Sequence, residues 1–166
     1  MLKEIKNKRE HYFVDYQNRK QGEYKDYHKN GQLFEHSFYL NGKLHGEYKT
    51  YYDNGQLWEH IFYLNDKLHG DFTIYHMNGQ LHIQTFFQND KRHGEYKEYH
   101  VNGQLHIHTF FQNGKLHGEH KNYFENGELN YATFYYQGKN LNVDPDTLTE
   151  KDKTYIMLSG RLPHRD

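Results

Sequence analysis

The sequence predicts an all-β protein: an elongated, single-layer antiparallel β-meander of tandem 24-residue hairpin repeats, closed by a short C-terminal capping helix. Asn-Gly pairs, which favour tight turns, recur every 24 residues from Asn30-Gly31 to Asn126-Gly127. Between the turns lie short runs rich in Tyr, Phe, Ile and Thr, which favour strands. A glycine series keeps the same step, at Gly22, Gly46, Gly70, Gly94 and Gly118.

The composition favours a thin structure over a deep core. Hydrophobic residues make up only 34% of the chain, which is typical of disorder, but aromatic residues reach 17%, which disordered chains lack. A polar chain with many Tyr and Phe residues is better suited to a sheet or solenoid with much exposed surface. We therefore expect five repeats that each advance by ~10 Å, two strands at a time.

Charge and cysteine content exclude several classes of function. Lys plus Arg is 21 and Asp plus Glu is 22, so the net charge is −1, and no basic surface for nucleic acid is expected. Without cysteine, neither a disulfide nor a Cys-ligated zinc site can form. No apolar run approaches a membrane span or a signal peptide, so an intracellular, cytoplasmic, soluble protein is expected. A single alanine, Ala132, suggests an AT-rich genome, such as that of a bacterium or large DNA virus.

Each repeat contains two turns and two strands. A second turn series begins at Asn41-Gly42-Lys43, and the Asn-Gly turns are expected to be type I′, with positive φ angles. In the second strand, Leu81, Ile83, Thr85 and Phe87 alternate with polar residues and are expected to form the inner face. In the first strand, aromatic residues lie three positions apart, whereas side chains on the same face of a strand lie an even number of positions apart. Either a bulge occurs there or both faces carry aromatic residues.

The ends differ from the middle and divide the chain into three parts. Residues 1–10 form a charged N-terminal segment, residues 11–140 form the repeat array, and residues 141–166 form a C-terminal cap. In the cap, Thr149 to Asp152 resembles a capping box that opens a short helix through Leu158, ending at Gly160. We expect this helix to cover the last edge of the sheet.

The run Asn41-Gly42-Lys43-Leu44-His45-Gly46-Glu47-Tyr48 resembles the core of a MORN repeat. It recurs at Asn113–Gly118 and, with Asp for Gly, at Asn65–Gly70 and Asn89–Gly94, and the resemblance covers roughly residues 11–140. An aromatic-aromatic-x-Asn-Gly-x-Leu extension is similar to the variant repeat of bacterial antitoxin-component-type proteins. The resemblance implies a twisted single-layer sheet that serves protein interaction, oligomerisation or membrane association and has no catalytic residues. Asp66 and Asp90 depart from the pattern where glycine is usual at a turn, and His120 stands in an aromatic position.

One aromatic column is the candidate binding face. If the strand register holds, its residues share one side of a sheet that cannot hide both of its faces. They would dock a partner or a second copy of the chain, and the alternative is ordinary packing by curling or self-stacking. The residues are Phe34, Phe38, Trp58, Phe62 and Phe86.

Histidines and charged pairs are interpreted as structural, and no metal, cofactor or catalytic residue is predicted. Equivalent histidines lie ~10 Å apart, too far for a shared metal, and should hydrogen-bond the neighbouring turn. His82, His106 and His108 are interpreted as a solvated polar face. Repeated Glu and Lys suit cross-strand pairing, whereas an active site needs one asymmetric constellation. The regular series is His45, His69, His93 and His117.

These observations predict a non-enzymatic protein-interaction or scaffolding module with an unidentified protein partner. A homodimer formed through the aromatic face is one form that such a module takes. A toxin-neutralising antitoxin or immunity protein is an alternative suggested by the resemblance alone. A membrane-lipid-associating module is a weaker alternative, because the sequence lacks a basic patch.

Overall fold

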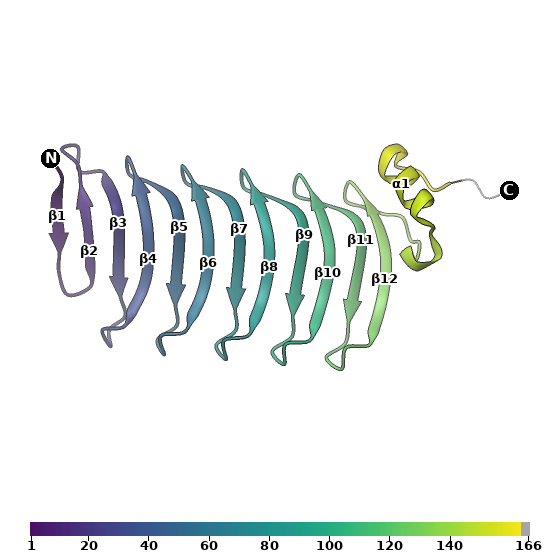
Figure 1. The fold of residues 1–166 in the computed structure, drawn as a ribbon, viewed down its shortest axis with the longest axis horizontal. Helices are drawn as coiled ribbons and strands as arrows, with labels where there is room; N and C mark the ends of the chain where they lie inside the picture. The colour runs from purple at the N-terminus through teal and green to yellow at the C-terminus, as the bar shows by residue number, and fades with distance from the viewer. Residues whose placement is uncertain (164–166) are drawn as a thin grey trace.

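The computed structural model describes residues 1–163, which form one open 13-stranded antiparallel sheet with a single α-helix at its C-terminal end (Figure 1). Every strand pairs with the next strand in the sequence, as in a meander. The predicted fold class is therefore confirmed. The strands are β1 (Lys3–Lys6), β2 (Glu10–Val14), β3 (Lys20–Tyr27), β4 (Leu33–Leu40), β5 (Lys43–Tyr51), β6 (Leu57–Leu64), β7 (Lys67–Tyr75), β8 (Leu81–Gln88), β9 (Lys91–Tyr99), β10 (Leu105–Gln112), β11 (Lys115–Tyr123), β12 (Leu129–Tyr136) and β13 (Lys139–Asn140).

The charged segment at residues 1–10 is part of the sheet. Its strand β1 pairs with β2, so that Lys3 lies opposite Val14 and Lys6 lies opposite His11. This hairpin precedes the first full repeat and forms the N-terminal edge (Figure 1). The lysines of β1 suit that position, because a charged edge strand discourages pairing with another chain.

The two turns of each repeat differ in type. In the turn at Asn41-Gly42, both residues have positive φ, 54° and 81°, as a type I′ turn requires. In the turn at Asn30-Gly31, only the glycine does, with φ of 88°. Here the prediction of a type I′ turn was wrong. The chain instead forms a three-residue loop, in which the amide of Gly31 donates to His28 O (2.9 Å).

Aspartate replaces glycine in two of the type I′ turns. Asp66 and Asp90 have φ of 66° and 64°, which aspartate adopts less readily than glycine. Each side chain accepts a hydrogen bond from the preceding repeat: Asp66 Oδ1 from the amide of Leu44 (2.8 Å) and Asp90 Oδ1 from that of Leu68 (2.9 Å). This contact between repeats offsets the conformational cost of aspartate.

A β-bulge recurs in every repeat and decides which side chains share a face. Asp26 lies opposite Glu35, but the next residue, Tyr27, lies opposite Leu33, so Phe34 is an extra residue in β4. The same shift recurs in the four later repeats. The extra residue lies in the second strand of the repeat, so the alternation in β3 is unbroken from Tyr24 to Tyr27 and these two side chains turn to opposite faces. Of the two explanations for the aromatic spacing, aromatic residues on both faces is the correct one. A bulge places two successive residues on the same side, which reverses the alternation beyond it.

The two faces of the sheet differ in burial. We call one the packed face. This face buries small and aromatic side chains such as Thr85 and Phe87, which are 5% and 9% exposed. The alternation along β8 predicted that these two residues would be buried. Burial raises the pKa of its tyrosines, including Tyr24, Tyr48 and Tyr96. The other face, which we call the phenylalanine face, carries one phenylalanine per repeat at Phe38, Phe62, Phe86, Phe110 and Phe134.

The cap contains a 3₁₀ turn, η1 (Pro145–Thr147), and the helix α1 (Glu150–Ser159). Thr149 and Asp152 form the predicted capping box, and Gly160 ends the helix with φ of 70°. The helix stands at the β12–β13 end of the sheet (Figure 1), as expected. Within residues 1–163, no helix is both long and apolar enough to cross a membrane.

Candidate binding face

The structure brings together three of the five predicted aromatic residues. Phe38, Phe62 and Phe86 lie one repeat apart on the phenylalanine face, each opposite an acidic residue of the neighbouring strand. Phe34 and Trp58 do not join them, which corrects the prediction. Each is the extra residue of its bulge and turns to the packed face.

Ring and polar contacts fix the placement of this bulged position. Phe34 lies edge-on to His28, and Trp58 stacks on Tyr52 with ring centroids 5.6 Å apart. The equivalent residue of a later repeat, His106, has its Nδ1 3.3 Å from Glu98, a carboxylate of the packed face. Phe110 and Phe134 complete the phenylalanine column instead, and the 24-residue step from Phe86 could have identified them.

Each phenylalanine stands beside a charged cluster from the preceding strand and its own. Glu23 accepts from Lys25 Nζ (2.9 Å), two residues along β3, and lies 2.8 Å from His36 Nε2 across the sheet. The His36 ring in turn contacts Phe38, with centroids 5.2 Å apart. The hydrogen bond from Lys25 lowers the pKa of Glu23. The repeats at Glu47 and Glu95 have the same glutamate–lysine–histidine arrangement.

The third repeat lacks the cations of the others. At the equivalent positions it has Asp71, Thr73 and Gln84, beside Phe86. Within residues 1–163, Asp71 therefore has no ion-pair partner. Phe86 is 39% exposed and is the most exposed phenylalanine of the column.

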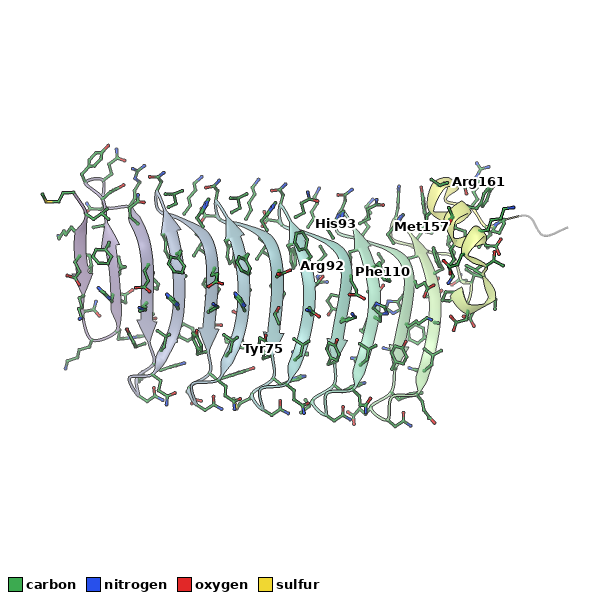
Figure 2. All side chains as sticks on the ribbon, viewed as in Figure 1. Tyr75, Arg92, His93, Phe110, Met157 and Arg161 are labelled. Atoms are coloured by element: carbon green, nitrogen blue, oxygen red, sulfur yellow. The ribbon has the colours of Figure 1, made fainter. Side chains whose placement is uncertain are left out.

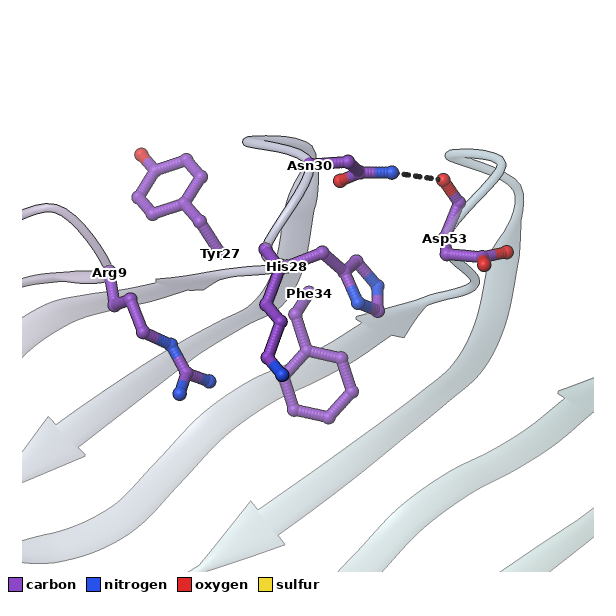
Figure 3. Close-up of a pocket in the computed structure, with 7 residues that line it drawn as sticks. Arg9, Tyr27, His28, Asn30, Phe34 and Asp53 are labelled. Atoms are coloured by element: carbon purple, nitrogen blue, oxygen red, sulfur yellow. Dashed lines mark hydrogen bonds between the residues drawn. The ribbon is translucent and has the colours of Figure 1, made fainter.

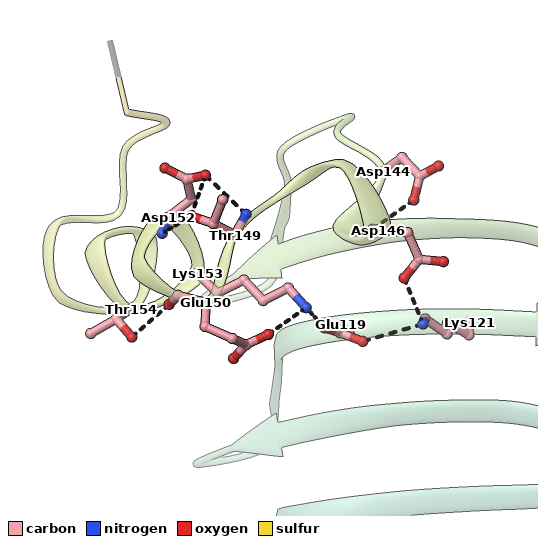
Figure 4. A network of polar contacts seen from close by, with 9 residues as sticks. All are labelled: Glu119, Lys121, Asp144, Asp146, Thr149, Glu150, Asp152, Lys153 and Thr154. Carbon is pink, nitrogen blue, oxygen red and sulfur yellow. Dashed lines mark hydrogen bonds and ion pairs between the residues drawn. The ribbon is translucent and has the colours of Figure 1, made fainter. Parts of the chain in front are cut away.

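The fifth repeat is covered by the cap (Figure 4). Phe134 is only 2% exposed and forms a buried cluster with Leu148 and Ile156 of the cap. Lys153 of α1 pairs with Glu119, and this hydrogen bond raises the pKa of the lysine. The cap therefore covers the phenylalanine face of the last repeat as well as standing at the edge.

A groove runs along this face between α1 and β9. Its volume is about 480 Å³, and it is open to solvent along its length. Figure 2 labels His93, Phe110 and Met157, which line it together with Phe134 and Glu119. The groove joins the covered fifth repeat to the uncovered fourth repeat.

A second hollow, about 450 Å³ in volume, lies at the turn of the first repeat and is lined by Arg9, His28, Phe34 and Asp53 (Figure 3). The hydrogen bond within it, from Asn30 Nδ2 to Asp53 O (2.9 Å), joins two neighbouring turns. Similar bonds link later turns, from Asn78 to Val101 and from Asn102 to Glu125. This hollow is therefore part of the repeated scaffold.

The regular histidines lie beside the neighbouring type I′ turns. His117 Nδ1 accepts from the amide of Gln137 (3.2 Å), and His45 Nδ1 lies 3.4 Å from Asn65 Oδ1. His69 and His93 occupy the same position, but their Nδ1 atoms are buried without a hydrogen-bond partner in the described part of the chain. His45 and His117 thus contact the neighbouring turn, and a structural role for the whole series stays a prediction.

The less regular histidines do not share a face. His82 stacks on His76, and the His106 ring is tilted against that of His100, so that His82 and His106 turn to the packed face, whereas His108 pairs with Glu95 on the phenylalanine face. Among residues 1–163, no group of three or more histidine or acidic side chains is arranged to hold a metal ion.

His120 is expected to make the protein less stable in mild acid. It is 9% exposed, stands against the rings of Tyr131 and Tyr135, and its Nδ1 has no hydrogen-bond partner among residues 1–163. Burial lowers its pKa below 6.5, so the unfolded chain takes up a proton first as the pH falls. Stability is therefore full above pH ~6.5 and decreases below it.

Urea denaturation between pH 7.5 and 5 would measure this dependence. Equivalent positions hold aromatic residues, as at Tyr96, so His120→Tyr is a variant the fold already accepts and should flatten the profile in this range. An unchanged profile in His120→Tyr would contradict the prediction.

An open antiparallel sheet of two-stranded repeats, with a column of phenylalanines along one face, defines a β-hairpin repeat protein. The chain belongs to the family described as the MORN repeat variant, whose model matches five consecutive repeats across well over half of its length. MORN repeats are commonly protein- or membrane-interaction modules. No curated protein matches the chain. The matched repeats are residues 20–41, 44–65, 68–89, 92–113 and 116–137.

Proposed function

We propose that this chain is a non-enzymatic scaffold that binds a protein partner through its phenylalanine face. The observation that carries the proposal is the difference between the last and the middle residue of the phenylalanine column. Phe134 is covered by the chain's own cap, whereas Phe86, at the equivalent position, is 39% exposed. A row of aromatic side chains on an exposed surface is typical of protein interfaces.

The charges of this face support a protein over a lipid surface as the partner. Lys25, Lys49 and Lys97 each pair with a glutamate of the same strand, at 2.7 to 2.9 Å. These lysines are partly neutralised and do not form a continuous basic patch of the kind that anionic membranes attract. A surface of alternating charged pairs and aromatic rings instead suits a partner with its own complementary pattern.

The repetition of the face supports a binding role over a catalytic one. The same glutamate, lysine and histidine recur on the first, second and fourth repeats. Catalysis needs one asymmetric arrangement around the reacting atoms, whereas binding benefits from repeated equal contacts.

Photo-cross-linking tests the proposal. A cross-linking amino acid replaces Phe62 on one face or Trp58 on the other, four residues apart on β6, and the chain is irradiated in its native cell extract. We expect protein adducts from position 62 and few from position 58. Light scattering adds a test for self-association, shown by a mass above 20.3 kDa. Absence of adducts at position 62 together with a monomeric mass would overturn the proposal.

A further inference from the structure

The cap shows how a helix binds to the phenylalanine face. In α1, Ile156 packs against Phe134, and Lys153, one helical turn earlier, pairs with Glu119. Phe134 and Glu119 are directly opposite each other on β12 and β11. The binding unit is thus a phenylalanine and a carboxylate on the sheet, matched by an aliphatic residue and a lysine on the helix.

The fifth repeat can accept Lys153 because it lacks a histidine of its own. Repeats one, two and four place His36, His60 or His108 against the glutamate, but the fifth has Ala132 at this position. Its own lysine, Lys121, lies 3.5 Å from Glu119 but also reaches Asp146 of the cap at 2.9 Å. Glu119 is therefore available to a lysine from outside the repeat.

The third repeat has the same unit without an occupant. Asp71 and Phe86 lie opposite each other, as Glu119 and Phe134 do. Gln84 stands where the histidine would be and Thr73 stands where the lysine would be, so the carboxylate has no ion-pair partner among residues 1–163. Asp71 and Phe86 therefore lack the lysine and the aliphatic side chain that α1 supplies to the fifth repeat.

We propose that Asp71 and Phe86 form the centre of a docking site for an amphipathic helix of a partner protein, one that carries a lysine three residues before an aliphatic residue. This inference rests on the proposed function and names the chemistry of its partner. Two strands advance by ~10 Å and seven helical residues by ~10.5 Å. A helix that crosses the strands therefore meets Phe62, Phe86 and Phe110 with aliphatic residues seven apart.

The probe is a designed 24-residue helical peptide with three isoleucines at seven-residue spacing and a single lysine three residues before the central isoleucine, labelled with a fluorophore, whose helicity is first verified by circular dichroism. Anisotropy with the full chain measures the dissociation constant. We expect binding that weakens about tenfold or more in Asp71→Lys and in Phe86→Ala. The control Trp58→Ala removes an equally exposed aromatic ring from the other face and should leave the affinity unchanged.

A charge exchange makes the test specific. A peptide with Glu in place of Lys should bind the wild-type chain poorly and bind Asp71→Lys better than the lysine peptide does. Absence of binding by the verified helix, or binding that neither Asp71→Lys nor Phe86→Ala weakens, would overturn the inference. If protein adducts still form from the cross-linking amino acid at position 62 in that case, the proposed scaffold function stands, and the partner has a different chemistry. If they are absent as well, both proposals fail.

Discussion

Replacing Ile156 with aspartate is expected to release the C-terminal cap from the sheet. Ile156 is 0% exposed, and it joins Phe134 and Leu148 in the only buried apolar cluster found among residues 1–163. Truncation of a large buried aliphatic side chain costs about 2–5 kcal/mol, and burial of a carboxylate at the same place costs more. The ion pairs of Lys153 are partly exposed and too weak to hold the helix alone.

Hydrogen exchange resolved by peptide tests this prediction. Amides of α1 should lose protection in Ile156→Asp, while those of β6 to β8 should keep theirs, because each repeat contacts only its neighbours. Leu158→Asp makes the same chemical change two residues away on the same helix, where the side chain is 81% exposed, and should have little effect. Equal protection of α1 in the wild type and in Ile156→Asp would show that the cap does not depend on this cluster.

Release of the cap would also convert the fifth repeat into a second open unit. Phe134 and Glu119 would then present the same ring and carboxylate that Phe86 and Asp71 present in the third repeat. The cap therefore both stands at the end of the sheet and covers the phenylalanine face of the fifth repeat.

Much of the fold could be predicted from the sequence, because the residues that set the turns and strands of each repeat lie within that repeat. Glycines and Asn-Gly pairs at a constant step set the turns, and short aromatic and β-branched runs between them set the strands. A meander then needs no long-range information, because each strand pairs with the next one. The capping box at Thr149 is local in the same way, and the helix begins and ends where predicted.

The candidate face was only partly predictable because it depends on register. Simple alternation places Phe34 and Trp58 with Phe38 and Phe62, but one extra residue per repeat reverses the alternation between them. The sequence contains no signal that locates this bulge, which lies in the second strand of the repeat and not between the aromatic residues of the first. The contact of the cap with Phe134 could not be predicted from the sequence either, because no local sequence pattern links the cap to this residue.

Gly70→Ala is expected to destabilise the middle of the array by about 2–4 kcal/mol. Gly70 has φ of 114°, a conformation that L residues avoid, and a Cβ added there would lie 3.0 Å from Phe62 Cβ, across the sheet. The strain and the contact add, because Phe62 is held in place by its neighbours on the phenylalanine face. Native-state hydrogen exchange of β6 and β7 would measure the loss.

Gly46→Ala provides the matched control that separates the two causes. Gly46 occupies the same repeat position with a similar φ of 106°, but an added Cβ would lie 3.7 Å from Phe38 Cβ, which is ordinary van der Waals contact. It should therefore cost only the backbone term, about 1–2 kcal/mol. The difference between the two variants then measures the close approach of β7 to Phe62, and equal losses would show that backbone conformation alone requires glycine at this step of the repeat.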